Sequence, residues 1–522
     1  MEISKIFQAN RPPNFGGAAD EYLPGIAIDI DKLLAKEINL FSFDTMKLTK
    51  EERQELAVII VEFVEDIHNN IGFWESYEKF NEEYFGMPFP PLAKTVSQKI
   101  ESRFTADRLH HLLQINYEEL RPDLLIPPNH SDLRHLALSI SRFFEREFAN
   151  KPIDSGIQKF LSQPNIEAGD VKRKLIWAGT KGYLFRLRYR NFLKEIEQEA
   201  SIPVIDDFVC QEDTTLSGLG VIDILSEILT ITDSQKKELR SWYERHIAYY
   251  QIQKINGSLL EALNIINEKK YIINARDFVE IFKVDEVFLG GLIPWDGVWY
   301  WSGKQHRIGT IPDRKIGKLK ENFLVKHPRI CYRYHKELLE RATASNDEQH
   351  SAFVEYFGDN LVIFADGLSM ASAIQKKDQH LYGSKLSEEE LADLMERHQL
   401  KKASPDYVYP EQLLESNDGI GYFFNPQEGQ EIMQGFDEIV SGFKKNGIDL
   451  TEEENEAIRT FIESDSISPG FVSRMIRDYG HESIASAFLV KTNSTKKCVE
   501  YLLRKYKGHY YRNRYPPISF VE

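Results

Sequence analysis

The chain has 522 residues, which is too many for one hydrophobic core, so we expect two to four domains. Hydrophobic residues make up 42% of the sequence and charged residues 28%, as in globular proteins that fold in water. The net charge of -16 disfavours long-range binding of the whole molecule to nucleic acid or to an anionic membrane, although a local basic surface could still bind a polyanion.

The cysteines and the apolar stretches predict the cellular compartment. Cys210, Cys331 and Cys498 form no CxxC pair, so we expect neither a disulfide framework nor a cysteine zinc site. The first residues lack a basic region followed by an apolar core, and the sequence has no run of about 18 apolar residues. We therefore expect a cytoplasmic protein without a membrane partner, and the sequence predicts no cofactor.

Residues 1–268 are predicted to form an N-terminal helical domain. Thr49 and Glu52 have the spacing of a capping box, and apolar residues then recur at helical spacing from Leu56 to Ile67. Further helices are expected at 94–118, 131–149 and 233–254. The histidines at positions 110, 111, 130 and 135 do not share one helical face, so we predict no metal site there.

Residues 270–380 are predicted to form a small α+β module, with a helix near 334–356. Short β-branched and aromatic runs favour strands at 271–273, 279–282, 287–289, 298–301, 330–334 and 361–364. Pro294 and Gly297 predict a tight turn, with proline at its second position. The alternation of side chains along a strand then places Trp299 and Trp301 on one face.

Residues 381–522 are predicted to form a C-terminal helical domain that ends in a basic, tyrosine-rich tail. Helices are expected at 388–398 and 427–445, with a connector at 401–425 between them. Capping-box pairs start two helices of this domain: Ser387 with Glu390, and Thr451 with Glu454. The predicted fold class is therefore mostly α with a small central α+β module, in a multidomain chain.

The tryptophan-rich hairpin is one candidate binding surface. Exposed tryptophan rings anchor bases, sugars and protein partners efficiently. The candidate partner-binding residues are Trp295, Trp299, Trp301, Lys304 and Arg307. The alternative is that the rings fill the core of the small module, in which case Lys304 to Arg307 form a polar, basic rim beside it.

The C-terminal tail is the second candidate. From Lys496 to Arg514 it contains seven Lys or Arg and one Glu, a local charge of +6. Basic residues interleaved with tyrosines are typical of a surface that binds nucleic acid. The candidate nucleic-acid-binding residues are Arg504, Lys505, Lys507, Tyr510, Tyr511, Arg512 and Arg514. The alternative is an amphipathic final helix whose cations pair with acidic residues of the same protein, such as those in 449–465.

Catalysis is the third possibility. His306, His481 and Glu482 are acid–base side chains that a catalytic site could use, although no complete triad is present. The pairs Asp206-Asp207 and Asp285-Glu286 could hold a metal, but acidic residues in loops are usually solvated.

We therefore hold three hypotheses. The first is a non-catalytic interaction protein that binds nucleic acid or a protein partner, mainly through the tail. The second is a hydrolase-type enzyme whose site lies between the α+β module and the C-terminal helices. The third is a structural subunit of a larger assembly.

Overall fold

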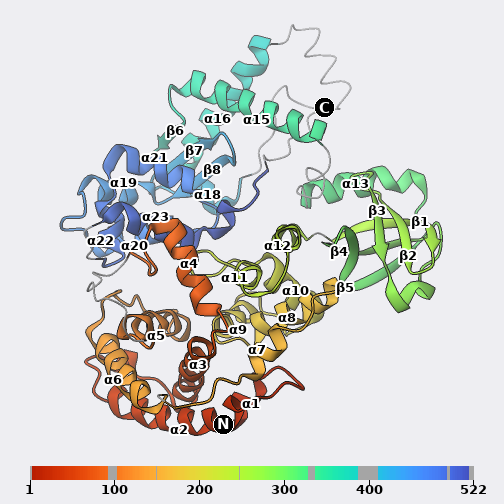
Figure 1. Ribbon diagram of the computed structural model, residues 1–522. Coiled ribbons are helices and arrows are strands. Elements are labelled where there is room, and N and C mark those ends of the chain that lie inside the picture. The colour runs from red at the N-terminus through yellow and green to blue at the C-terminus, as the bar shows by residue number, and fades with distance from the viewer. Residues whose placement is uncertain are drawn as a thin grey trace. The chain divides into compact units, whose positions relative to one another are not determined.

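The computed structural model describes residues 3–91, 103–148, 150–245, 247–326, 336–385, 409–490 and 494–515. Contacts within the chain define two compact units (Figure 1). Unit 1 comprises Met1–Ile330 and Val490–His509, and unit 2 comprises Cys331–Leu489 and Tyr510–Glu522. The predicted fold class is confirmed: the protein is mostly helical, with a small closed barrel and a separate three-stranded sheet. The division into three domains stays a prediction.

Unit 1 is built mainly from helices. In chain order they are α1 (Ile3–Ala9), α2 (Ala19–Ile38), η1 (Asp44–Met46), α3 (Lys50–Asn69), α4 (Phe73–Phe85), α5 (Ala106–Leu120), α6 (Ser131–Glu147), α7 (Gly156–Leu161), α8 (Ala168–Thr180), α9 (Arg186–Glu195), α10 (Ile202–Gln211), α11 (Val221–Ile228), α12 (Asp233–Arg240), η2 (Ser241–Glu244), α13 (Asp313–Lys326) and α23 (Thr495–Tyr506). The Thr49–Glu52 capping box at the start of α3 is confirmed.

Helix α3 lies at the centre of this unit. Every residue from Leu56 to Asp66 is buried, so the helix is surrounded by protein on all sides. The predicted apolar stripe is therefore only part of its buried surface, because carboxylates on the other side of the helix are buried as well. One hydrophobic core runs from α1 through α12 and includes Ile293 and Trp295 of the barrel.

The same unit contains a closed five-stranded barrel (Figure 1). Its strands are β1 (Ile247–Asn256), β2 (Leu259–Asn264), β3 (Lys270–Asn274), β4 (Val287–Trp295) and β5 (Val298–Gly309), and η3 (Arg276–Ile281) lies between β3 and β4. The order is β1-β2-β3-β5-β4, with β3 parallel to β5 and all other pairs antiparallel. This is the strand order of the OB-fold.

Two predictions in this region were wrong. The helix expected at 233–254 ends at Arg240, and β1 follows; in β1 the buried Ala248, Tyr250 and Ile252 alternate with outward residues, which is a strand pattern. The strand expected at 279–282 is mostly η3, and Phe282 after it packs against Trp301 inside the barrel.

The predicted hairpin is present, but its turn is shifted. Trp295 pairs with Val298, so the central turn residues are Asp296 and Gly297, with φ of 51° and 74°. Two positive φ angles match the right-handed twist of the strands, and Asp-Gly suits them. Pro294 lies in β4 opposite Trp299 and is not part of the turn.

Unit 2 contains the three-stranded antiparallel sheet and several helices. Its elements are α15 (Lys336–Phe357), β6 (Leu361–Phe364), α16 (Gly367–Lys385), α18 (Glu411–Leu414), β7 (Ile420–Asn425), β8 (Gly429–Gln434), α19 (Phe436–Lys444), α20 (Glu452–Glu463), α21 (Pro469–Tyr479) and α22 (Glu482–Ala487). The short helix η4 (Gly508–Tyr511) contains the boundary between the units.

The strand at 361–364, the helix near 334–356 and the Thr451–Glu454 capping box are confirmed. The connector at 401–425 and the helix at 427–445 were wrong in part, because β7 and β8 precede α19. All six residues of β7 are buried, so this strand has no alternation to reveal it. The strand at 330–334 and the helix at 388–398 lie outside the described residues. Among those described, no helix combines the length and apolarity that crossing a membrane requires.

Trp295→Ala should lower the free energy of unfolding by about 3–5 kcal/mol, because a fully buried indole leaves a cavity. Its Nε1 also donates to the Asn165 carbonyl oxygen at 3.1 Å. Trp295→Phe should cost less, because it keeps most of the ring and removes only the hydrogen bond. Urea unfolding measures both variants, and equal losses would contradict this packing.

Candidate functional site

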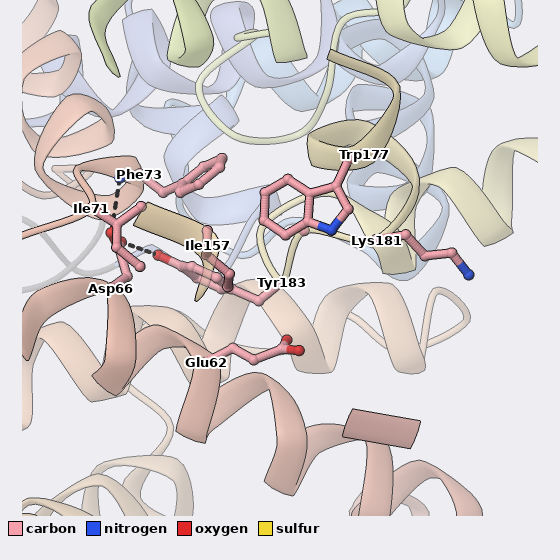
Figure 2. A pocket seen from close by; sticks show the side chains of 9 residues that line it. Glu62, Asp66, Ile71, Phe73, Ile157, Trp177, Lys181 and Tyr183 are labelled. Carbon is pink, nitrogen blue, oxygen red and sulfur yellow. Dashed lines mark hydrogen bonds between the residues drawn. The ribbon is translucent and has the colours of Figure 1, made fainter. Parts of the chain in front are cut away.

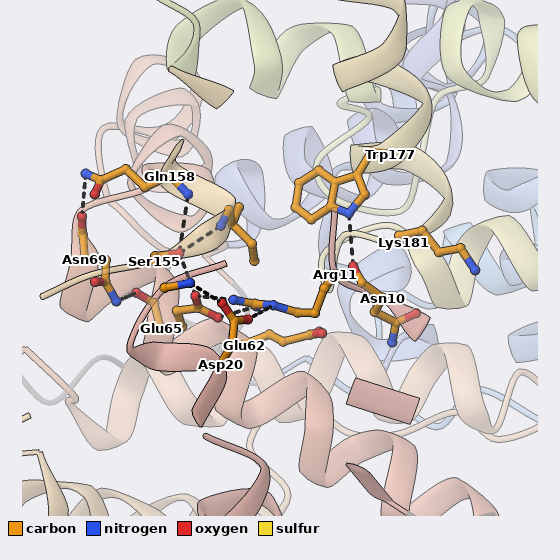
Figure 3. Close-up of polar contacts among 12 residues, drawn as sticks. Asn10, Arg11, Asp20, Glu62, Glu65, Asn69, Ser155, Gln158, Trp177 and Lys181 are labelled. Carbon is orange, nitrogen blue, oxygen red and sulfur yellow. Dashed lines mark hydrogen bonds and ion pairs between the residues drawn. The ribbon is translucent and has the colours of Figure 1, made fainter. Parts of the chain in front are cut away.

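Helix α3 carries a cluster of buried acidic side chains (Figure 3). Glu65 accepts two hydrogen bonds from the guanidinium of Arg11, at 2.6 and 2.8 Å, and a third from the Ser155 hydroxyl at 2.6 Å. Arg11 also forms an ion pair with Asp20 at 2.5 Å. The Ser155 hydroxyl additionally caps the start of α7. This half of the cluster joins α2, α3 and α7.

Arg186 neutralises the other half of the cluster. Its Nε donates to Glu55 at 2.5 Å, and its Nη1 donates to Glu62. Burial raises the pKa of Glu62 to about 7, against the opposing charge of Arg186. Glu55 has a second cation, Arg190, at 3.4 Å, whereas Glu62 is fully buried, so burial favours the protonated form of Glu62.

Asp66 has a structural role at the start of α4. Its carboxylate accepts from the backbone N–H groups of Gly72, Phe73 and Trp74 at 2.8, 3.1 and 2.8 Å, and from the Tyr183 hydroxyl at 2.7 Å. Burial raises its pKa, while these hydrogen bonds lower it. A carboxylate in this position satisfies N–H groups that the first turn of a helix leaves free.

A small cavity adjoins the cluster (Figure 2). It is lined by Glu62, Asp66, Ile71, Phe73, Ile157, Trp177, Lys181, Gly182 and Tyr183. Although the empty volume is about 280 Å³, the lining leaves space for only about one water molecule. A substrate or organic cofactor needs several hundred Å³, so this cavity is too small to hold one.

The acidic and histidine side chains of the protein do not form a metal site in the described ranges. Within the described ranges, no group of three or more His, Cys, Asp or Glu side chains could hold a metal ion. Burial lowers the pKa of His110 to about 4 and that of His111 to about 3, so both are neutral core side chains at pH 7. The partner of Asp206 is Lys172 at 2.9 Å, and no local pattern in the sequence predicts this pair. Asp207 pairs with Arg245.

Lys172 lies at the junction of the barrel and the helices. Its Nζ is 3.0 Å from the Ser302 hydroxyl and 3.1 Å from the Cys210 thiol. The Ser302 hydroxyl donates to Asp206 at 2.9 Å. Lys172 donates to Ser302, and the Ser302 hydroxyl donates to Asp206, so these contacts tie α8 and α10 to β5.

The three tryptophans of the hairpin lie mainly inside unit 1. Trp295 is fully buried and packs edge-on against Trp242. Trp299 packs against Tyr271, and Trp301 stacks on Phe282. These contacts favour the core alternative for the rings.

The basic rim is outside the core. Lys304, His306 and Arg307 are exposed on β5. Arg307 is paired with Glu286 at 2.7 Å, whereas within the described part of the chain Lys304 has no carboxylate partner.

The basic tail is held largely by internal contacts. Lys505 and Lys507 are buried, and Lys505 donates to Glu118 at 2.7 Å. The guanidinium of Arg504 lies 3.6 Å from the centre of the Tyr84 ring.

The end of the tail has partners within unit 2. Arg514 donates to Glu428 at 2.9 Å and lies over the Tyr510 ring, and the Tyr510 hydroxyl donates to the Asp465 carbonyl oxygen at 2.9 Å. Tyr511 and Arg512 also have interactions of their own. These contacts favour the internal-pairing alternative for the tail.

The three candidate catalytic side chains do not form one site within either unit. His306 belongs to unit 1, whereas His481 and Glu482 belong to unit 2. His481 precedes α22, and its backbone N–H donates to the exposed Glu482 carboxylate at 2.9 Å. This is a local cap at the start of a helix.

The structure adds a basic helix that our sequence reasoning missed. Helix α13 follows the barrel, and its Phe323 packs edge-on against Tyr249 of β1. Lys320 of α13 pairs with Glu268, which fixes the helix further. On adjacent strands, Tyr249 of β1 is paired with Leu289 of β4, and Leu289 is paired with His306 of β5. Because neighbouring strands are about 4.8 Å apart, Phe323 of α13 lies on the same side of the barrel as His306.

Together these elements form what we call the basic face, defined by the exposed side chains of Lys304, Arg314, Lys315 and Lys318. None of the four has a carboxylate partner among the described residues. The sequence signal was available: residues 298–326 contain seven Lys or Arg and two Asp or Glu, a net charge of +5.

Comparisons with known proteins concern the helical part of unit 1. Residues 11–200 match a family described as "Protein of unknown function (DUF3843)". The matched region contains the whole Arg11–Glu65 and Arg186–Glu62 cluster and ends before the barrel. Searches of curated proteins and of solved structures gave no match.

Glu62→Gln should reduce the pH dependence of the free energy of unfolding between about pH 4.5 and 7. The pKa of Glu62 in the folded protein, about 7, is above its ordinary value of 4.5. Its contribution is therefore complete below about pH 4.5 and is lost as the pH rises through 7. Urea unfolding across this range measures the slope.

Glu52→Gln is the matched control on the same helix. Hydrogen bonding to Arg121 lowers the pKa of Glu52 to about 2, so its contribution is present above about pH 4.5 and is lost as the pH falls toward 2. Glu62→Gln should change the free energy of unfolding between about pH 4.5 and 7, and Glu52→Gln should change it below about pH 4.5. Identical effects would contradict the assignment of the raised pKa to Glu62.

Lys505→Met should lower the free energy of unfolding by about 1–3 kcal/mol, because Glu118 loses its charged partner. Lys496→Met, at an exposed position of the same helix, should change stability by less than about 0.5 kcal/mol. Thermal and urea unfolding measure both. A destabilised Lys496→Met with an unaffected Lys505→Met would show that the tail is not held as described.

Proposed function

We propose that the protein is a non-catalytic interaction protein that binds nucleic acid through the basic face of the barrel and α13. The observation that carries the proposal is a group of exposed cations, without carboxylate partners among the described residues, on the barrel and α13 of a protein whose net charge is -16. Unpaired lysines and arginines that displace counterions from phosphates supply most of the affinity in sequence-independent nucleic-acid binding.

The barrel supports the same proposal by its topology. OB-fold barrels bind oligonucleotides and oligosaccharides through strands 2 and 3 and through the loops β1–β2 and β4–β5. Here the β4–β5 turn is occupied, because the N–H groups of Asp296 and Gly297 donate to Glu238 of α12 at 2.6 and 3.0 Å. The outer face of β2 and β3 presents Leu259, Glu261 and Ile272 with one exposed cation, Lys270, so it has little net positive charge. Binding is therefore assigned to the basic face and not to the usual OB-fold surface.

The tail contributes less to this proposal than its composition suggests. The side chains of Lys505 and Arg514 are bound to acidic groups of the protein, and breaking such a buried pair to reach a phosphate costs free energy. A cytoplasmic location belongs to the same proposal, supported by Cys210 and Cys498, which are free and buried.

The combined variant Lys304→Glu, Arg314→Glu, Lys315→Glu and Lys318→Glu should lower the affinity for a single-stranded oligonucleotide by more than tenfold. For the unaltered protein, the slope of log K against log salt should be about -3, since four phosphates are neutralised at about -0.7 each. Fluorescence anisotropy between about 50 and 200 mM salt measures both quantities.

The matched control reverses four exposed lysines elsewhere in unit 1, namely Lys32, Lys36, Lys50 and Lys194. It changes the net charge equally, so it separates a local effect from an effect of total charge. Equal losses in the two variants, or affinity that does not depend on salt, would contradict the proposal.

A further inference from the structure

We infer that the basic face binds the phosphate backbone and does not distinguish one base from another. This inference rests on the proposed function and specifies its class of ligand: nucleic acid of any sequence. It follows from the exposure of the cations on the basic face and from the packing of the aromatic rings beside them.

The tyrosine and tryptophan rings near the face pack within the protein, whereas the imidazole of His306 is exposed. Sequence-tolerant stacking on bases needs exposed rings. Tyr249 is in contact with Phe323 at a ring distance of 5.4 Å, and Trp301 stacks within the barrel on Phe282 at 5.7 Å with nearly parallel planes. Tyr300 packs on the helical core and has the guanidinium of Arg276 over its ring. None of these tyrosine and tryptophan rings can stack on a base without leaving a packed position.

Base edges are read by groups that form two hydrogen bonds at once, such as arginine or a side-chain amide. Three of the four cations of the basic face are lysines, which act as point charges and suit phosphate without geometric selectivity. The amide of Gln305, next to Lys304, donates to the Gly303 carbonyl oxygen at 2.5 Å. The basic face therefore supplies positive charge but few side chains that can form two hydrogen bonds to a base edge.

The arrangement of the cations suits a continuous backbone. Arg314 and Lys318 are four residues apart on α13, so they lie on one side of the helix, about 6 Å apart along its axis. Lys315 is adjacent to them in sequence, and Lys304 is an exposed cation on β5, the strand that precedes α13. The separation of Arg314 and Lys318 is suited to neighbouring phosphates of one chain.

Two exposed side chains provide the sharpest test, because they could read or stack on a base. Asn322 is one helical turn beyond Lys318 and has an exposed side chain. Phe278 is an exposed ring on η3. If the inference is correct, Asn322→Ala and Phe278→Ala bind oligonucleotides with affinities within tenfold of the unaltered protein. Neither residue has a role in the charge-reversal experiment, so its variants report on base recognition alone.

The experiment measures the affinity of the full-length protein for oligodeoxythymidine, oligodeoxyadenosine and a mixed-sequence strand of equal length, at fixed salt. We expect all three affinities to agree within tenfold, which is about the discrimination that one good base contact gives. A preference above tenfold for one base, or a loss above tenfold in either alanine variant, would overturn the inference while leaving nucleic-acid binding intact. Absence of salt-dependent binding to every strand would instead overturn the proposed function.

Discussion

The structure of unit 1 depends on the neutralisation of the acidic residues of α3. A helix that is buried on every side must satisfy each charged group it carries, since an isolated buried carboxylate is costly. Arg11 and Arg186 supply that neutralisation from segments far apart in the sequence, before α2 and at the start of α9. Their pairing therefore fixes the register of the surrounding helices against α3, and apolar packing alone would specify it less narrowly.

The position of the barrel follows from a second set of buried polar contacts in the same unit. The indole N–H of Trp242 in η2 donates to the Pro294 carbonyl oxygen at 2.8 Å. Trp295 donates to Asn165 in the loop between α7 and α8, so the hairpin is held from two segments of the helical part. Lys172 binds Asp206 and Ser302 and joins α8 and α10 to β5. The hairpin is thus the attachment point of the barrel. Because its rings are needed for attachment, the free surface of the module lies further along β5 and on α13.

Local signals in the sequence predicted those features that depend on neighbouring residues. The Thr49 capping box and the Asp-Gly hairpin involve residues only a few positions apart, so both could be predicted. Strand β1 could not, because its apolar residues continue from α12 in a pattern that also fits a helix. Strand β7 is buried on both faces and has no alternation, so it was assigned to a connector.

The candidate sites show the same division between local and distant information. The charges of the tail were visible, but Glu118 and Glu428 are 387 and 86 residues away from the cations they bind. The residues near Lys505 and Arg514 in the sequence do not predict these partners. The positive charge of α13 was equally visible in the sequence. Its significance depends on the contact between Phe323 and Tyr249, which places the helix beside the rim of β5.

The C-terminal tail and residues 298–326 have similar local charges but different surroundings. The tail has a local charge of +6 and residues 298–326 have +5. In the tail, carboxylates and tyrosine rings of the protein lie within contact distance of the cations, so a polyanion must compete with bonds already formed. On α13, the exposed cations Arg314, Lys315 and Lys318 project from a helix whose apolar side is held by the barrel. Water and counterions are then the competitors, and releasing counterions is the step that favours binding to a polyanion. Of two stretches with similar charge, residues 298–326 are therefore the better candidate for an interaction surface, because Lys304, Arg314, Lys315 and Lys318 have no carboxylate partner among the described residues.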